Sequence, residues 1–425
     1  MSFQTIRERL YKGVYMRGLI KNISWIFTGN LFSAFTKWFI LVLIARILTP
    51  IDVGAYALAF AVTAPITILL NLRLRSLVVT DKHLNFSNYI YIRNITSYVA
   101  VLLLFLIGLI FYPKYIFLII LVGLNKLYDL FSELYYSIPQ LKDDFDFIGK
   151  LMILKHVLIL VFFVLGIYIS QNLHIALLIS LVIQVLFFYY VEKRITENKY
   201  RITYPNKESK EIKNIIKLGI PLGISLMLVS LNSNIPRYIL EYFESAEVLG
   251  YFSAVTYILT IGNLVMNSVS QNFLLMLSRT INNGSYKQFL KYLYVYITSF
   301  SIALGLIIIL FAYFFGEIFL NLVYGASYGK YVDVLVLMSI SMAINFVSWG
   351  FDTALMSIRY VKIQPFIALT TAITSAVLGY ILILDYGIQG AAYTIIVAQV
   401  IQLLLRVYFV SYGLKTKQGN LSRNL

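Results

Sequence analysis

The sequence predicts an all-α polytopic membrane protein with about 12 transmembrane helices. Of its 425 residues, 60% are hydrophobic and 13% are charged, whereas a soluble globular chain has about 45–50% apolar and about 25% charged residues. The mean hydropathy of +0.81 agrees with this difference. Lipid therefore surrounds most of the chain, and a water-soluble fold is excluded.

Apolar stretches of membrane-spanning length recur along the whole chain. A helix needs about 20 mostly apolar residues to cross a hydrocarbon core of roughly 30 Å. The stretches of this length are 22–47, 51–71, 93–112, 115–137, 151–170, 173–191, 214–240, 247–273, 289–314, 332–357, 361–384 and 387–411. Transmembrane strands alternate in polarity over about ten residues, but the apolar runs Val101–Phe111 and Ile307–Phe315 do not alternate. Helices are therefore predicted for these spans.

The basic residues indicate how the helices are oriented. The formal net charge is +16, and most of the 35 Lys and Arg residues lie on the side that both termini share. In the loops on the opposite side, Lys114 and Lys330 are the basic residues. Cytoplasmic loops carry an excess of Lys and Arg, so both termini are predicted to be cytoplasmic. The positive charge reports this orientation, and no nucleic-acid partner is expected.

The longest polar stretch, Glu192–Lys217, divides the predicted spans into six and six. We therefore predict an N-terminal six-helix lobe over 1–200, a cytoplasmic linker over 201–217 and a C-terminal six-helix lobe over 218–425. Because six spans return the chain to the same side of the membrane, an axis along the membrane normal is expected to relate the two halves.

A weak internal repeat supports this division. Aligning Gly54 with Gly250 also aligns Ile20-Lys21 with Ile216-Lys217 and Tyr56-Ala57 with Phe252-Ser253. The matches fall at corresponding places in the two halves. The halves are therefore predicted to share one architecture.

Several kinds of active site lack their residues. The chain has no cysteine, which excludes disulfides and thiolate metal sites. Its histidines, His83, His156 and His174, are far apart in the sequence, which disfavours a histidine metal site. No Gly-x-x-x-x-Gly-Lys-Ser/Thr loop is present to bind a nucleotide. No catalytic residue, cofactor or metal is predicted.

Cations within the first and seventh predicted spans are candidates for function. An ionisable side chain at bilayer depth costs about 2.5–3.5 kcal/mol on insertion, so it normally faces a bundle interior, a cavity or a partner. Lys37 shares a helix face with Asn30 and Ser33, and Arg237 shares one with Asn234. Both helices are predicted to direct a polar, cation-bearing stripe inward.

The fourth predicted span carries Lys126, Asp129 and Glu133 on one face. Burial raises the pKa of a carboxylate and a neighbouring cation lowers it. These acids could therefore bind and release H⁺ or Na⁺ as their surroundings change. The alternative is a static cluster that neutralises Lys126 and holds the helix to its neighbours.

Other charges near the membrane have similar alternatives. Asp352 in the tenth span could couple an ion or pair with Arg359 or Arg406. Lys155 and His156, one turn inside the fifth span, are expected to reach toward the lipid headgroups.

Five segments of the chain share one resemblance: Lys21–Trp25, Ile44–Ala59, Lys217–Leu222, Val248–Ala254 and Val323–Tyr328. They resemble the polysaccharide flippases that carry repeat units of O-antigen or capsule. This family belongs to a superfamily that also holds the multidrug and toxic-compound extruders and the peptidoglycan lipid II flippase.

The resemblance implies two six-helix lobes around a central cavity in the bacterial cytoplasmic (inner) membrane. It implies flipping of an undecaprenyl-diphosphate-linked oligosaccharide from the cytoplasmic to the outer leaflet by alternating access. The coupling ion would be H⁺ or Na⁺. Expected partners are this polyprenyl-diphosphate-linked glycan, membrane lipid, a polymerase and other membrane proteins of polysaccharide assembly.

A lipid diphosphate is a compact polyanion that Lys and Arg can bind. Lys37 and Arg237 are therefore predicted as headgroup ligands, with Lys126 and Arg46 as further candidates. The alternatives are a pair between Lys37 and a carboxylate of the fourth span, a pair between Arg237 and Glu241, and snorkelling of Arg46 to the interface.

Two other functions compete with this interpretation. A multidrug extruder of the same superfamily would favour acids in its cavity, whereas the deep charges predicted here are Lys37 and Arg237. A membrane glycosyltransferase or ligase would place catalytic residues on a large outward loop, but the longest such loop, about 315–331, has one acid, Glu317. An anionic lipid-linked substrate is therefore favoured.

Overall fold

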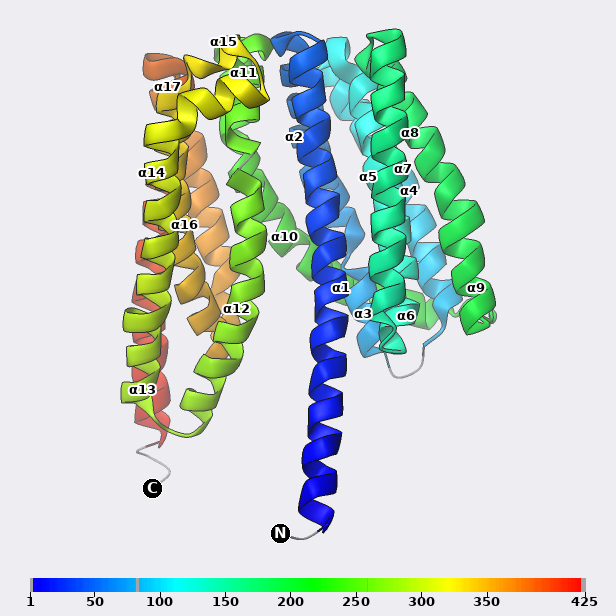
Figure 1. The fold of residues 1–425 in the computed structure, drawn as a ribbon, viewed down its shortest axis with the longest axis vertical. Helices are drawn as coiled ribbons and strands as arrows, with labels where there is room; N and C mark the ends of the chain where they lie inside the picture. Colours follow the sequence, from blue (N-terminus) through cyan, green and yellow to red (C-terminus); the bar gives the residue numbers. More distant parts are fainter. Residues whose placement is uncertain (1–2, 82–83, 258, 422–425) are drawn as a thin grey trace. The chain divides into compact units, whose positions relative to one another are not determined.

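The computed structural model describes residues 3–81, 84–257 and 259–421. These residues form helices and no strands, which confirms the predicted fold class (Figure 1). The α-helices are α1 (Phe3–Ile47), α2 (Pro50–Asn71), α3 (Leu74–Thr80), α4 (Phe86–Phe111), α5 (Ile116–Tyr135), α6 (Ser137–Leu141), α7 (Phe145–Ser170), α8 (Leu173–Phe187), α9 (Arg194–Tyr200), α10 (Ser209–Phe243), α11 (Ala246–Tyr257), α12 (Leu259–Asn282), α13 (Tyr286–Leu290), α14 (Thr298–Val323), α15 (Ala326–Gly329), α16 (Val332–Ser357) and α17 (Gln364–Leu421). Two π-helical turns, η2 (Phe188–Lys193) and η3 (Lys291–Ile297), interrupt this pattern.

Ten helical stretches in the described part of the chain are long and apolar enough to cross a membrane. One of them, Val361–Thr416, covers both of the last two predicted spans. It is bent at Gly387, where φ of 52° and ψ of −127° depart from helical values. The predicted span 247–273 is covered by α11 and α12, between which residue 258 lies outside the described part. The count of about 12 stays a prediction.

Backbone packing groups the chain into two compact units. The first unit comprises Met1–Ile40 and Leu69–Gly223, and the second comprises Leu41–Ile68 and Ile224–Leu425. Most of α2 thus packs with helices of the C-terminal half, although in sequence it lies between α1 and α3 of the first unit. The division into consecutive lobes stays a prediction about the topology.

A crossing of α2 and α11 explains why residues 41–68 group with the second unit. A Cβ atom added to Gly54 would lie 1.6 Å from the carbonyl oxygen of Ala246, and one added to Gly250 would lie 2.0 Å from that of Pro50. The two helices therefore touch backbone to backbone. The alignment of Gly54 with Gly250 also places Pro50 on Ala246, so the contact is reciprocal, as it is between two-fold-related segments.

In the first unit, α1 is seated against α7 by another close approach. A Cβ atom added to Gly149 of α7 would lie 2.5 Å from the carbonyl oxygen of Trp25. The neighbouring helices α7 and α8 pack together, and α5 packs against both α4 and α8. Ion pairs from α5 to α1 and to α7 link the inward faces of these three helices inside this unit.

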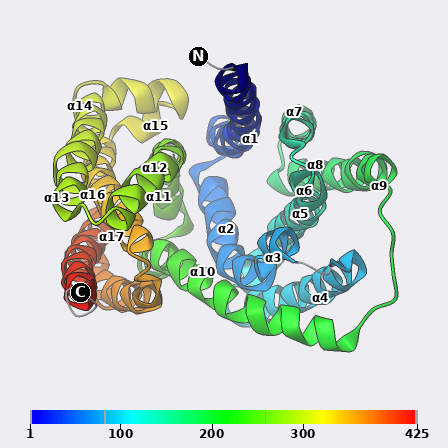
Figure 2. The same ribbon diagram turned by 90° about the horizontal axis from the view of Figure 1, so that it is seen from below.

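In the second unit, α16 is the central helix. It packs against α12, α14 and α17, and Figure 2 shows α14, α16 and α17 side by side. Near one end of these helices, Leu277, Phe289, Phe351 and Val410 form part of a buried apolar cluster.

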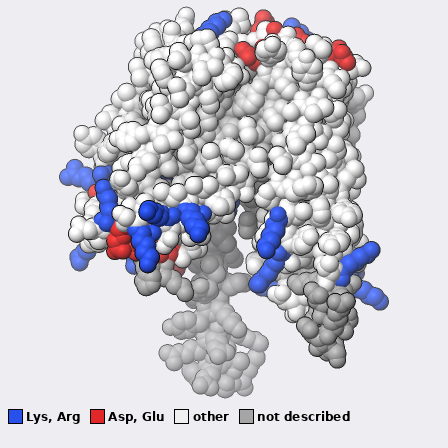
Figure 3. Space-filling view, turned by 180° about the vertical axis from the view of Figure 1, so that it is seen from behind, with Lys and Arg blue, Asp and Glu red and all other residues white. Residues whose placement is uncertain are grey.

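Large apolar side chains are exposed on the outer faces of both units. Ile110 and Phe111 of α4 and Ile307 and Phe314 of α14 are each about two-thirds exposed. On the face in Figure 3, charged side chains gather toward the two ends and leave a broad uncharged band between them. Such a surface is suited to lipid, and the protein is a multi-pass membrane protein.

We expect Gly54→Leu to destabilise the second unit, because a side chain cannot fit between the two backbones. Overpacking of this kind costs about 1–3 kcal/mol. Unfolding of the purified protein in detergent, followed by intrinsic fluorescence, should show a lower midpoint temperature. Ala376→Leu on an exposed position of α17 is the control and should leave the midpoint unchanged. An unchanged midpoint for Gly54→Leu would contradict the backbone contact.

Candidate functional site

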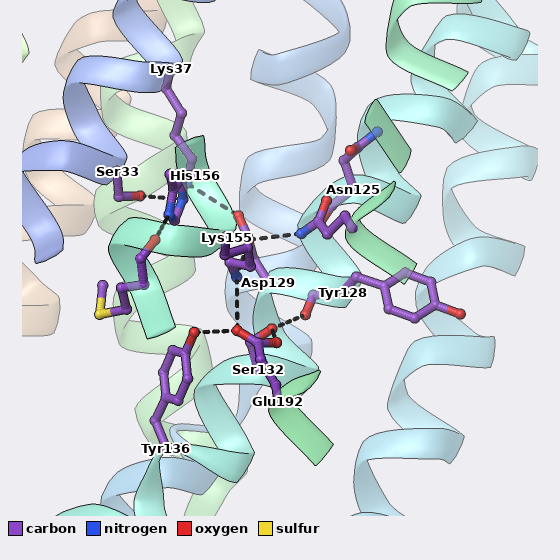
Figure 4. A network of polar contacts seen from close by, with 12 residues as sticks. Ser33, Lys37, Asn125, Tyr128, Asp129, Ser132, Tyr136, Lys155, His156 and Glu192 are labelled. Carbon is purple, nitrogen blue, oxygen red and sulfur yellow. Dashed lines mark hydrogen bonds and ion pairs between the residues drawn. The ribbon is translucent and has the colours of Figure 1, made fainter. Parts of the chain in front are cut away.

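A network of four charged side chains lies inside the first unit (Figure 4). The Lys37 Nζ atom on α1 is 3.2 Å from Asp129 Oδ2 on α5. Lys155 Nζ on α7 is 3.0 Å from Asp129 Oδ1 and 4.0 Å from Glu192 Oε1 on η2. Two lysines thus balance two carboxylates. The network joins three helices and a π-helical turn.

The position of Glu192 depends on the π-helical turn η2. Glu192 is 0% exposed, and its carboxylate accepts hydrogen bonds from the hydroxyl groups of Ser132 and Tyr136. π-Helical turns within α-helices occur frequently at functional sites. In the sequence, Glu192 is the first residue of the longest polar stretch. In the structure, the helical segment continues through this residue and directs its side chain into the unit.

A histidine ring contacts α1 one turn before Lys37. His156 Nδ1 lies 2.7 Å from the carbonyl oxygen of Met152, and Nε2 lies 2.8 Å from Ser33 Oγ. Because a carbonyl can only accept, Nδ1 donates to Met152, and Nε2 shares the second hydrogen bond with the serine hydroxyl. Ser33 and Lys37 share a helix face, so this bond also orients Lys37.

The members of the network differ in exposure. The Lys37 side chain is 39% exposed and the Asp129 side chain 27%, whereas Lys155 is 3% exposed. The expectation that Lys155 and His156 reach toward the headgroups was wrong, because both are buried against α1 and α5. Lys37 makes the pair with a fourth-span carboxylate that the sequence offered as its alternative to ligand binding.

Glu133 and Lys126 lie on the same helix as Asp129, but Glu133 has different partners. Glu133 Oε2 accepts from Asn71 Nδ2 at 3.3 Å, and Asn71 Oδ1 accepts from Arg93 Nη2 at 2.8 Å. Lys126 is half-buried, three residues before Asp129. The carboxylate of Glu133 therefore ties α5 to the end of α2.

Arg93 closes the C-terminal end of α2. Its guanidinium donates to the carbonyl oxygens of Leu70 at 3.2 Å and Asn71 at 3.1 Å. The last carbonyls of a helix have no partner within the helix and carry partial negative charge. Arg93 is the first residue of the predicted span 93–112, and its side chain is 1% exposed because it packs against this helix end.

In the second unit, Arg237 is part of a hydrogen-bonded row along α10. Its Nη1 atom donates to Asn234 Oδ1 at 2.8 Å, and Asn234 Nδ2 donates to the carbonyl oxygen of Ser230 at 2.8 Å. The predicted polar stripe is therefore connected by direct contacts. Arg237 belongs to a different compact unit from Lys37.

Arg46 closes the C-terminal end of α14. Its Nε atom donates to the carbonyl oxygen of Val323 at 2.9 Å, and Nη2 donates to those of Asn321 at 3.2 Å and Leu322. A cation is favourable at this end of the helix dipole. The exposed side chain of Arg46 thus contacts a specific helix end, and its snorkelling to the interface stays a prediction.

Asp352 joins α16 to α17. Its Oδ1 atom is 3.0 Å from Arg406 Nη2 and accepts from Gln364 Nε2 at 2.5 Å. Arg406 Nη1 also donates to Ser348 Oγ at 2.8 Å. The pair with Arg406 that the sequence offered as an alternative to ion coupling is thus present.

The chemistry available in these clusters is ionic. Among the described residues, no group of three or more His, Asp and Glu side chains could hold a metal ion. Lys37 is the half-exposed cation of the buried network and keeps donors for an anion. Arg237 offers a second, half-buried guanidinium in its own unit.

Comparisons with known proteins agree with the fold. A family model described as "Polysaccharide biosynthesis protein" matches residues 19–280. The capsular polysaccharide biosynthesis protein CapF of Staphylococcus aureus is 32% identical over 402 residues, which cover 92% of this chain and 99% of that protein.

Two solved structures share the architecture. The lipid II flippase MurJ in an inward closed conformation matches with a TM-score of 0.70 and 16% identity, covering 90% of this chain and 86% of that chain. An inward-facing multidrug resistance transporter of the MATE family in the MOP superfamily matches with a TM-score of 0.67 and 14% identity, covering 91% and 96%. These structures show the fold. The chain belongs to the polysaccharide biosynthesis protein family.

Proposed function

We propose that this transporter flips an undecaprenyl-diphosphate-linked oligosaccharide repeat unit from the cytoplasmic to the outer leaflet of the bacterial cytoplasmic membrane. The product would enter the synthesis of a capsule, O-antigen or exopolysaccharide. Family membership and the capsule-related relative support a lipid-linked glycan as the substrate. The observation that carries the proposal is Lys37, a half-exposed cation at membrane depth.

The diphosphate is the part of this substrate that needs a cation. A lipid diphosphate that leaves the headgroup region loses hydration, and charge-assisted hydrogen bonds from Lys or Arg replace it. Lys37 and Arg237 are the proposed ligands, and Lys126 lies on the same helix as the partner of Lys37. Arg46 is weaker in this role, because its donors are used on α14.

Ion coupling is proposed to act through a carboxylate that changes partners. The candidates are Asp129, Glu133 and Asp352, and each contacts side chains of other helices. Asp129 pairs with Lys37 and Lys155. Glu133 accepts from Asn71, and Asp352 pairs with Arg406. Binding of H⁺ or Na⁺ would weaken the corresponding tie between helices. Alternating access requires helices to move relative to one another, so contacts of this kind between helices must break and re-form.

Both termini are proposed to lie in the cytoplasm, as the distribution of Lys and Arg indicates. A polymerase and other membrane proteins of polysaccharide assembly are proposed to act on the product in the outer leaflet.

A multidrug extruder is the competing function, because its fold is similar. The cationic Lys37 and Arg237 favour an anionic substrate instead.

Replacing the proposed headgroup ligands should stop transport. In a strain that lacks the gene, Lys37→Ala and Arg237→Ala should restore at most about a tenth of the wild-type surface polymer, since each removes a charge-assisted contact. Mass spectrometry of extracted lipids should show that the lipid-linked oligosaccharide accumulates. Lys150→Ala, which removes an exposed pair with Asp146, is the matched control. Full export by the double mutant would refute the headgroup assignment, and drug sensitivity without lipid accumulation would favour the extruder.

Neutralising the coupling carboxylate should separate transport from the ion gradient. Asp129→Asn, Glu133→Gln and Asp352→Asn each keep the shape of the side chain and remove its charge. In proteoliposomes, the variant at the coupling site should lose its response to an imposed H⁺ or Na⁺ gradient while transport without a gradient persists. If all three variants respond as the wild type does, coupling through these residues is wrong.

A further inference from the structure

One carboxylate in the buried network serves two lysines through different oxygen atoms. Asp129 Oδ1 accepts from Lys155 Nζ at 3.0 Å and from Gln184 Nε2 at 2.8 Å. Asp129 Oδ2 is 3.2 Å from Lys37 Nζ. The two lysines come from different helices, Lys155 from α7 and Lys37 from α1, and each is near a different oxygen atom of the carboxylate (Figure 4). Asp129 can therefore lose one lysine without losing the other.

The two lysines are not equivalent. Lys155 is 3% exposed and is enclosed between Asp129 and the fully buried Glu192. Lys37 is 39% exposed. Removing one partner of a buried ion pair is strongly destabilising, whereas a partly exposed pair contributes little. Lys155 is therefore a permanent member of the network, and Lys37 is the member that can leave.

The consequences of releasing Lys37 follow from the contacts that remain. Asp129 keeps the ammonium of Lys155 and the amide of Gln184. Glu192 keeps its hydroxyl donors from Ser132 and Tyr136. The Asp129 side chain is 27% exposed and therefore remains open to water. Without Lys155, by contrast, Lys37 would be the cation that this carboxylate depends on, and it would be held more firmly.

We propose that Asp129 stands in for the substrate's diphosphate in the empty transporter, and that Lys155 is a positioning residue that allows Asp129 to give Lys37 up to the anion. Binding is then an exchange: the ammonium of Lys37 leaves a carboxylate oxygen and bonds a phosphate oxygen. This inference rests on the proposed function, since it requires an anionic group at Lys37. It adds a reason why the cation that binds the headgroup is paired internally.

The exchange can be tested by binding of undecaprenyl diphosphate to the purified full-length protein, followed by native mass spectrometry. Lys37→Met should weaken binding by about tenfold. Asp129→Asn should tighten it by about threefold, because the internal competitor loses its charge. Lys155→Met should weaken binding by about threefold or more, although Lys155 does not touch the ligand. The double variant Asp129→Asn/Lys155→Met should bind at least as tightly as the wild type.

The rescue in the double variant distinguishes exchange from a structural role. If Lys155 only supported the fold, removing a second charge from the network would not restore binding. Lys150→Met on the same helix is the control and should bind as the wild type does. Gel filtration and the unfolding midpoint establish that each variant is folded. If Lys155→Met does not fold, Asp129→Asn alone still decides, because tighter binding supports exchange and weaker binding overturns it.

Failure of the two proposals gives different results. If the wild type and Lys37→Met bind undecaprenyl diphosphate equally, the headgroup assignment of the proposed function fails and the exchange fails with it. If Lys37→Met weakens binding but the double variant binds no better than Lys155→Met, the exchange alone is overturned.

Discussion

An ionised side chain at the depth of a bilayer costs about 2.5–3.5 kcal/mol on insertion, and the internal organisation of this protein depends on how that cost is offset. In the first unit, Lys37 and Lys155 are balanced by Asp129 and Glu192. In the second, Arg406 is balanced by Asp352. Each pair joins different helices, so the same contacts that make the charges tolerable also hold the helices together.

Two arginines apply the same physics to the backbone. Arg93 closes the end of α2 and Arg46 closes the end of α14, in both cases by donating to the last carbonyl groups of the helix. These carbonyls are costly to leave without a partner in a low-dielectric environment. A basic residue near the membrane can thus stabilise the fold. Arg46 and Lys37 were both predicted to bind the substrate, but the donors of Arg46 bind the end of α14.

Small residues set the geometry around which the charged groups are arranged. The reciprocal contact of Gly54 and Gly250 brings α2 and α11 together at equivalent places of the internal repeat. Gly149 does the same for α1 and α7, and this seats Ser33 beside His156. The charge pairing depends on these approaches, because an ion pair across two helices requires their backbones to be close.

Composition and periodicity alone determined the class of this protein and its inward-facing candidates. An apolar chain with long helical periods must form membrane helices, because the bilayer offers no partner to an open backbone. The spacing of polar residues within each helix also placed Lys37 on a polar face of α1 and Asp129 on a polar face of α5. Only the tertiary structure decided that Lys155 and Glu192 join them and that Glu133 does not. Helical periodicity describes one face of one helix, whereas pairing between helices depends on how distant segments pack.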